Sequence, residues 1–168
     1  NAFIPIFWTR ELGTSPEQGS FALTVFFSIG IFMTYIGGLL GDKFGPIKII
    51  RLSLLIWLPA MFLLTEVPNF SPVIMLPVGY LLLLMIGAAK AISYSPVIVL
   101  GQTYLAKSIG FASGITLGVS QTIGGVIAPV VGNLADTYSL PVAMMTLVPF
   151  LIGGLGASLL LKDPKKLQ

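Results

Sequence analysis

Residues 37–48 read GGLLGDKFGPIK, and this stretch decides how the chain is organised. It separates two long apolar runs and concentrates glycines, one carboxylate and two lysines within a few residues. Gly38, Gly41 and Gly45 recur at spacings of three and four, which places small residues on one helix face and a permissive backbone at the turn. A plain hydrophilic turn needs no such spacing. The stretch therefore predicts a tight connection between two apolar helices.

The composition predicts that these helices lie in a membrane. Hydrophobic residues make up 55% of the chain, charged residues only 9%, and the mean hydropathy is +0.98. A soluble domain carries about 25% charged residues. The charges are clustered, which leaves uncharged stretches long enough to span a bilayer. We therefore expect an all-α membrane protein, built as a polytopic helical bundle in contact with the lipid bilayer.

The residue types that are missing exclude several functions. The chain has no cysteine and no histidine, so thiolate chemistry is impossible and the commonest general base and metal ligand is absent. No paired carboxylates fall inside the apolar runs, so we expect no enzyme active site, no metal and no cofactor. The net charge of +3 comes from short basic loops rather than a basic face, so nucleic acid is not an expected partner.

The apolar runs predict five full spans and the end of a sixth. The spans are expected at about residues 19–41, 47–65, 73–105, 109–134 and 141–161. Residues 1–8 are too short to span and end in a tryptophan, which predicts the end of a helix whose beginning is missing. Ser15 or Ser20 is expected to cap the first full span. At ~1.5 Å per residue the third span is roughly 50 Å long, against a hydrocarbon core of about 30 Å, so it must tilt, kink or project.

The basic residues predict the orientation. One side of the predicted bundle holds Lys43, Lys48, Arg51, Lys107, Lys162, Lys165 and Lys166. The opposite side holds only Arg10. By the positive-inside rule the cation-rich side is cytoplasmic. We therefore expect an integral protein of a bacterial inner membrane with its carboxyl terminus in the cytoplasm.

The opening stretch also carries a family signature. Its pattern Gly-x-x-x-Asp-Lys-x-Gly resembles the loop that joins the second and third helices of a six-helix repeat in the major facilitator superfamily. The matching residues are Gly38, Asp42, Lys43 and Gly45, and Lys48 serves as the basic residue that closes the motif. Pro46 departs from the pattern, because the family usually has arginine or lysine there.

A second stretch supports the same resemblance. Residues 102–118 and 121–136 are similar to the junction of the tenth and eleventh helices in that superfamily, especially in drug exporters of the fosmidomycin-resistance type. The resemblance covers nearly all of the chain from Thr9 onward. It implies a twelve-helix fold of two six-helix halves, of which this chain would be the carboxyl-terminal half with its first helix truncated. The amino-terminal half would then be its partner.

The resemblance implies a secondary active transporter that moves a small solute or drug by alternating access, with proton-coupled export. Two alternatives remain open: anion or metabolite uptake or exchange with Lys90 as counter-ion, and a membrane receptor or scaffold that transports nothing. Asp42, Glu66 and Asp136 all fall at span ends, so no carboxylate lies inside a predicted span. If protons are coupled, the titrating group is Lys90 or lies in the absent half.

Lys90 is the one charge deep inside a predicted span. A cation at the bilayer centre costs ~2.5–3.5 kcal/mol on insertion scales, so it needs a compensating environment. It is expected either to face a central cavity as a substrate-binding or coupling group, or to be a structural lysine paired in the missing half. Ser93 and Tyr94 follow at i+3 and i+4 and could share its site. Gln121, also mid-span, is expected to line the cavity or to bond a neighbouring helix.

Two further sets of residues have expected roles. The resemblance implies that Asp42 contacts a helix amino terminus of the opposite half, and that Gly38, Lys43 and Gly45 share in this conformational gate. Such a contact is worth about 0.3–1 kcal/mol. The alternative is a solvated loop. Small-residue spacing along the fourth predicted span predicts close helix packing. Its members are Gly110, Gly114, Gly118, Gly124, Pro129 and Gly132.

Overall fold

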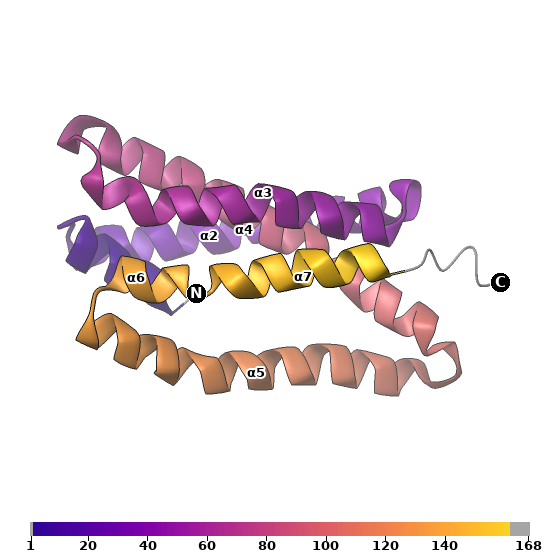
Figure 1. Cartoon of the computed structure of the whole chain (residues 1–168). Helices are drawn as coiled ribbons and strands as arrows, with labels where there is room; N and C mark the ends of the chain where they lie inside the picture. Colours follow the sequence, from indigo (N-terminus) through magenta and orange to yellow (C-terminus); the bar gives the residue numbers. More distant parts are fainter. Residues whose placement is uncertain (1, 162–168) are drawn as a thin grey trace.

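The computed structural model describes residues 2–161, and all the regular elements among them are helical (Figure 1). Here α denotes an α-helix, η1 a π-helical turn, and η2 and η3 are 3₁₀ turns. In chain order they are α1 (Phe3–Ile6), η1 (Phe7–Glu11), α2 (Pro16–Phe44), α3 (Pro46–Glu66), η2 (Val67–Asn69), α4 (Pro72–Tyr104), η3 (Ala106–Ser108), α5 (Ile109–Thr137), α6 (Leu140–Met145) and α7 (Val148–Leu160).

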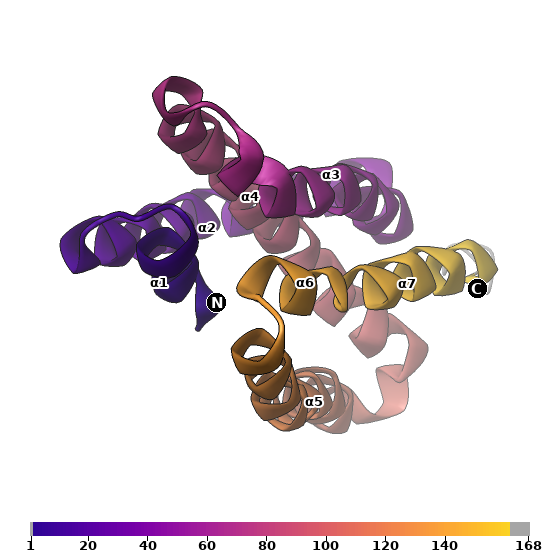
Figure 2. The ribbon, with the colours of Figure 1, turned by 60° about the vertical axis from the view of Figure 1, so that its left-hand side comes forward.

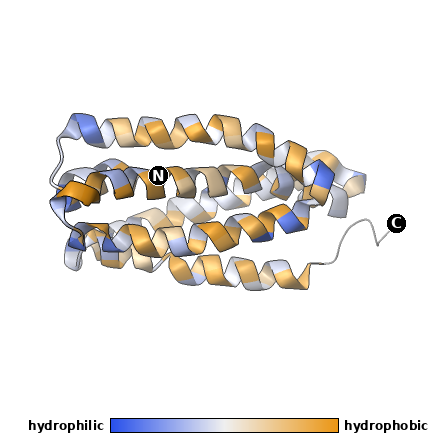
Figure 3. Cartoon of the chain, turned by 90° about the horizontal axis from the view of Figure 1, so that it is seen from above, coloured by the Kyte–Doolittle hydropathy of each residue, from blue (hydrophilic) through white to orange (hydrophobic). Residues whose placement is uncertain are grey.

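Within the described residues, five helical stretches are long and apolar enough to cross a membrane. Their hydrophilic residues gather toward the helix ends, whereas apolar residues cover the middles (Figure 3). The prediction of an all-α, polytopic helical bundle is confirmed. The basic tail predicted from the sequence, residues 162–168, falls outside the described residues.

The helix starts follow local rules. Ser15 caps α2 through a capping box: its Oγ accepts a hydrogen bond from the Gln18 backbone N–H at 3.4 Å, and Gln18 Oε1 accepts one from the Ser15 N–H at 3.3 Å. Of the two predicted caps, Ser15 is therefore the one used. Pro16, Pro46 and Pro72 begin α2, α3 and α4, where the missing proline N–H leaves no intrahelical bond unmade.

Helix α4 lies at the centre of the bundle. It packs along α2 on one side and α3 on the other (Figures 1 and 2). The largest buried cluster gathers where η1 meets α2, α3, α4 and α6, and it includes the fully buried rings of Phe7 and Trp8. The 33 residues of α4 measure roughly 50 Å at ~1.5 Å per residue, as the sequence predicts.

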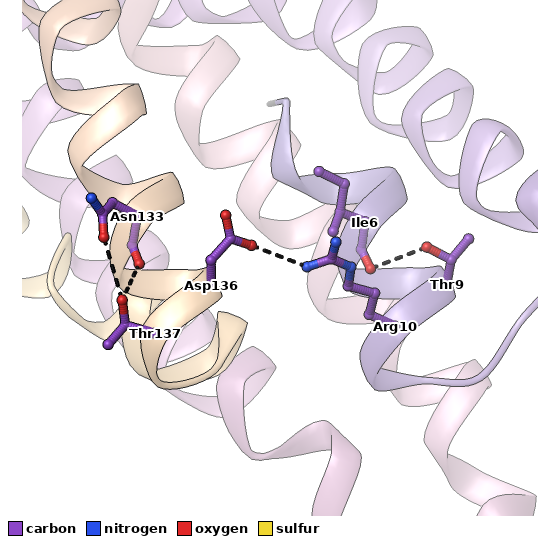
Figure 4. A network of polar contacts seen from close by, with 6 residues as sticks. All are labelled: Ile6, Thr9, Arg10, Asn133, Asp136 and Thr137. Atoms are coloured by element: carbon purple, nitrogen blue, oxygen red, sulfur yellow. Dashed lines mark hydrogen bonds and ion pairs between the residues drawn. The ribbon is translucent and has the colours of Figure 1, made fainter.

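Helix α5 stands apart from α2 and α3, with α6 and α7 between it and α3 (Figure 2). It is fixed near its two ends. At its start, Gln102 Nε2 of α4 donates a hydrogen bond to Ser113 Oγ at 2.8 Å. At its other end, Asp136 pairs with Arg10 of η1 at 3.3 Å (Figure 4). Only 6% of its most apolar stretch is buried, against 33% for α4.

The last apolar stretch, expected at 141–161, is divided in two. Helix α6 ends at Met145 and α7 begins at Val148. Pro149 gives the physical reason, because a proline lacks the N–H for a helical bond and its ring clashes with the carbonyl four residues earlier, here that of Met145. Near its end, α7 is tied to α3: Arg51 donates hydrogen bonds to the Ser158 carbonyl from Nε at 3.1 Å and from Nη2 at 2.7 Å.

Candidate functional site

Lys90 lies near the middle of α4 and is the sole charged residue of that helix. Its side chain is half-buried, and its Nζ lies 5.4 Å from the centre of the Phe26 ring of α2. An ammonium over a ring face is attracted by the negative π-cloud. The charge predicted from the sequence as an intramembrane site therefore faces α2.

A pocket of about 300 Å³ opens between α2 and α4 at this point. From α4 it is lined by Lys90 and Tyr94, and from α2 by Phe26, Phe27, Ile31 and Thr34, among others. We call it the Lys90 pocket. The Thr34 hydroxyl donates to the Gly30 carbonyl at 2.8 Å, so it can still accept a hydrogen bond. The Tyr94 side chain is half-exposed at the pocket.

A second cavity of about 200 Å³ meets the Lys90 pocket, and Phe26 and Lys90 line both. Its other walls come from α1, α3, α4 and α6, with Trp57 and Met61 as the large side chains of α3. Apart from Lys90, no charged side chain among the described residues lines either cavity.

Glycines on both helices hold Lys90 against α2. A Cβ added to Gly37 would collide with the backbone of Ile92, two residues beyond Lys90. A Cβ on Gly87, three residues before Lys90, would lie 2.9 Å from Ile29 Cγ2 and 3.2 Å from the Phe26 carbonyl oxygen. The two backbones can approach this closely because these positions lack side chains. This close α2–α4 interface fixes where the ammonium of Lys90 sits.

The other predicted binding residues are placed differently. The Ser93 hydroxyl donates to the carbonyl of Lys90 itself at 2.9 Å and does not line the Lys90 pocket. Gln121 is exposed on α5 and lines neither cavity. The structure thus brings Lys90 and Tyr94 together, and leaves Ser93 and Gln121 outside.

The predicted gating stretch is almost wholly helical. Asp42 and Lys43 are exposed in the last turn of α2, where Lys43 Nζ lies 5.3 Å from the Phe44 ring centre. Gly45 alone joins α2 to α3, with a φ of +94° that favours glycine. Gly38 belongs to the α2–α4 interface, because a Cβ there would lie 3.3 Å from Ser95 Oγ. The gating role itself stays a prediction.

Most of the glycine run of α5 faces open space among the described residues. A Cβ on Gly110, Gly114, Gly118 or Gly124 would meet nothing within 4 Å, and one on Gly132 would only touch Phe3 at 4.0 Å. Pro129 lies inside the same helix, on its outer surface. Residues 2–161 therefore do not test the predicted packing role of these residues, and it stays a prediction.

Sequence reasoning missed the α2 wall of the pocket. No charge or polar spacing marks Phe26, Phe27 or Thr34 in the sequence. Their position follows only from how α2 and α4 pair. Among the described residues there is no cluster of acidic, cysteine or histidine side chains able to hold a metal ion.

Five long apolar helices, with one cation in a mid-helix pocket among the described residues, define a polytopic helical membrane protein. The chain matches the family model of the Major Facilitator Superfamily over residues 1–168. It therefore belongs to that superfamily of transporters, and the predicted resemblance is confirmed.

Two curated relatives agree with this assignment. The chain is 32% identical over 151 residues to an uncharacterized MFS-type transporter, YfnC, of Bacillus subtilis (strain 168), covering 90% of this chain and 35% of that protein. It is 29% identical over 141 residues to the fosmidomycin resistance protein of Escherichia coli (strain K12), covering 83% of this chain and 33% of that protein. The chain thus spans about a third of the length of these relatives. No solved structure matches it significantly.

Proposed function

We propose that this chain forms the carboxyl-terminal half of a secondary active transporter that moves a small solute across a bacterial inner membrane by alternating access. The observation that carries the proposal is the Lys90 pocket, a cavity near the middle of the long helix α4 that is lined, within residues 2–161, by a single charged side chain. Transporters of this superfamily bind solute near the bilayer midplane, between two halves that rock about the site.

The distribution of cations supports a cytoplasmic carboxyl terminus. The α2–α3 and α4–α5 connections and the end of α7 lie at one end of the bundle (Figure 1). Lys43, Lys48 and Lys107 belong to these segments, and Arg51 follows one turn into α3. Arg10 lies at the opposite end, beside the end of α5. By the positive-inside rule, this distribution supports a cytoplasmic location for the first end.

Export coupled to protons is the direction that we propose. The support is the relative from Escherichia coli, whose name records resistance to fosmidomycin. The proton carrier would be Lys90 or a group in the amino-terminal half, because the acidic residues of the five described spans lie near the helix ends.

The test is transport by the full-length protein in proteoliposomes with an imposed proton gradient and fosmidomycin as the solute. Wild type is compared with Lys90→Ala and with the matched control Lys107→Ala, which removes an exposed cation from η3. Transport by wild type and Lys107→Ala, with loss in a folded Lys90→Ala, is the expected result. Equal transport by all three proteins would make Lys90 a structural lysine and contradict the proposed site.

A further inference from the structure

Among the residues that line the Lys90 pocket in the described part of the chain, Lys90 is the only charged one. The charged residues of α2, α3 and α4 other than Lys90 all lie near helix ends, namely Glu17, Asp42, Lys43, Lys48, Arg51 and Glu66. None of them lines the pocket or the cavity behind it. A solute that enters this pocket therefore meets one positive charge in a medium that screens it weakly. This disfavours cations and favours an anion.

The contact between Lys90 and Phe26 is weaker than a charge-assisted hydrogen bond to an anion. The ring face offers the ammonium a quadrupole, at 5.4 Å from Nζ to the ring centre. An anionic oxygen offers a full charge and accepts a charge-assisted hydrogen bond, which is the stronger interaction. An anion arriving through the open side of the pocket would be held at the ammonium above the Phe26 ring.

The rest of the pocket fits a compact apolar body. Phe27 and Ile31 contribute apolar walls, and the volume is about 300 Å³. An apolar cavity of about 150 Å³ already admits benzene, so this one has room for a single ring or short branched chain together with its head group. The hydroxyls of Tyr94 and Thr34 are the other polar side-chain groups of the lining. They supply polar contacts but no charge.

We propose that the Lys90 pocket binds a small organic monoanion, with the anionic group at Lys90 Nζ and a compact apolar or aromatic body against Phe26, Phe27 and Ile31. This inference rests on the proposed transport function, since it names the class of solute for the same site. It also separates binding from coupling. An anion held by the ammonium needs Lys90 protonated, so Lys90 cannot surrender its proton in exchange for that anion. Protons exchanged against such a solute must be carried by another group.

The test uses three probes of nearly one shape: benzoate, benzamide and benzylammonium. Their binding to the purified full-length protein is measured by ligand-observed NMR titration at neutral pH. Wild type should prefer benzoate. Lys90→Gln should weaken benzoate binding about ten- to a hundredfold, the range for loss of a hydrogen bond to a charged group, while benzamide binding changes by less than about threefold. Lys90→Arg keeps the charge and should keep the preference, and the control Lys107→Gln should match wild type.

Retained benzamide binding shows that Lys90→Gln is folded, and Lys90→Arg provides a second variant if it is not. Absence of benzoate preference in wild type, or the same preference in Lys90→Gln, would overturn the assignment of an anion. A failure of the proposed transport function can be told apart from a failure of the proposed anion site. Lys90-dependent benzoate binding without transport of any probe or of fosmidomycin would sustain the anion site and refute the transporter, whereas transport of benzamide or benzylammonium alone would do the reverse.

Discussion

The α2–α4 interface and helix α5 are both rich in glycine, yet they use it in opposite ways. In the interface, Gly37 and Gly87 let two backbones come close enough that an added Cβ would strike a neighbouring helix. On α5, Gly110, Gly114 and Gly118 face open space within residues 2–161. The comparison teaches that small-residue spacing marks a smooth helix face, whereas the partner decides whether that face is packed.

The largest effect is expected for Gly37→Ala, which tests whether α2 and α4 pack as closely as described. The added Cβ would collide with the backbone of Ile92, which cannot move without displacing α4. We expect a loss of about 3 kcal/mol in the free energy of unfolding, at the upper end of the range for overpacking. Thermal unfolding of the detergent-solubilised full-length protein measures it. Gly30→Ala is the matched control on α2, since its Cβ would lie 4.0 Å from Ala91 Cβ, an ordinary contact. Equal losses in the two variants would contradict the assigned interface.

Gly87→Ala should have a smaller effect on stability and a specific one on the Lys90 pocket. Its two shortest contacts, 2.9 Å to Ile29 Cγ2 and 3.1 Å to Phe26 Cδ2, are with side-chain atoms that can shift, and the nearest backbone atom, the Phe26 carbonyl oxygen, is 3.2 Å away. We expect a loss of about 1–2 kcal/mol. Because Phe26 lies beneath Lys90, benzoate binding should weaken more than benzamide binding. If both probes weaken alike, the substitution acts on the pocket as a whole, and Gly87 does not position the charge.

Gly114→Ala tests the other part of the comparison, the glycine face of α5. Nothing lies within 4 Å of the added Cβ among the described residues, and alanine is the better helix former. The structure leads us to expect a gain of up to about 1 kcal/mol in the unfolding free energy. A loss in the full-length protein would instead show that another part of the protein packs on this face, as the sequence predicts.

The smallest expected effect is at the end of α5. Arg10→Gln removes the ion pair with Asp136, whose two side chains are 64% and 75% exposed. Exposed pairs contribute about 0.2–1 kcal/mol and weaken with salt. The loss should therefore fade when unfolding is measured in high salt, and a loss that salt does not change would mean that the guanidinium acts through packing instead.

The sequence predicts the fold well because span length and hydropathy are local properties. Apolar runs between charged clusters indicate the membrane helices, and Ser15 with Gln18 indicates where α2 begins. Lys90 stands out because a charge inside an apolar run is rare. The partners of Lys90 do not stand out. Phe26 is 64 residues away in the chain and looks like any other membrane phenylalanine, so only the pairing of α2 with α4 reveals it.

Glycine spacing in the sequence does not predict which helix faces pack closely. The regular run on α5 is the clearer signal in the sequence, and it led to a packing prediction that the described residues do not test. The tighter approach occurs at Gly37 and Gly87, which are far apart in sequence and form no common spacing. Close packing is a property of pairs of helices, and a single sequence shows each helix alone.

Gly45 has a practical consequence for anyone who wishes to cut or label the protein. It is the only residue between α2 and α3, and Pro46 follows it at once with a fixed φ. A protease needs several extended residues to bind its substrate, and an inserted tag needs slack at both ends. This connection offers neither. An accessible site for a nick or a fluorescent reporter is better sought at residues 12–15, the longest stretch between regular elements within residues 2–161.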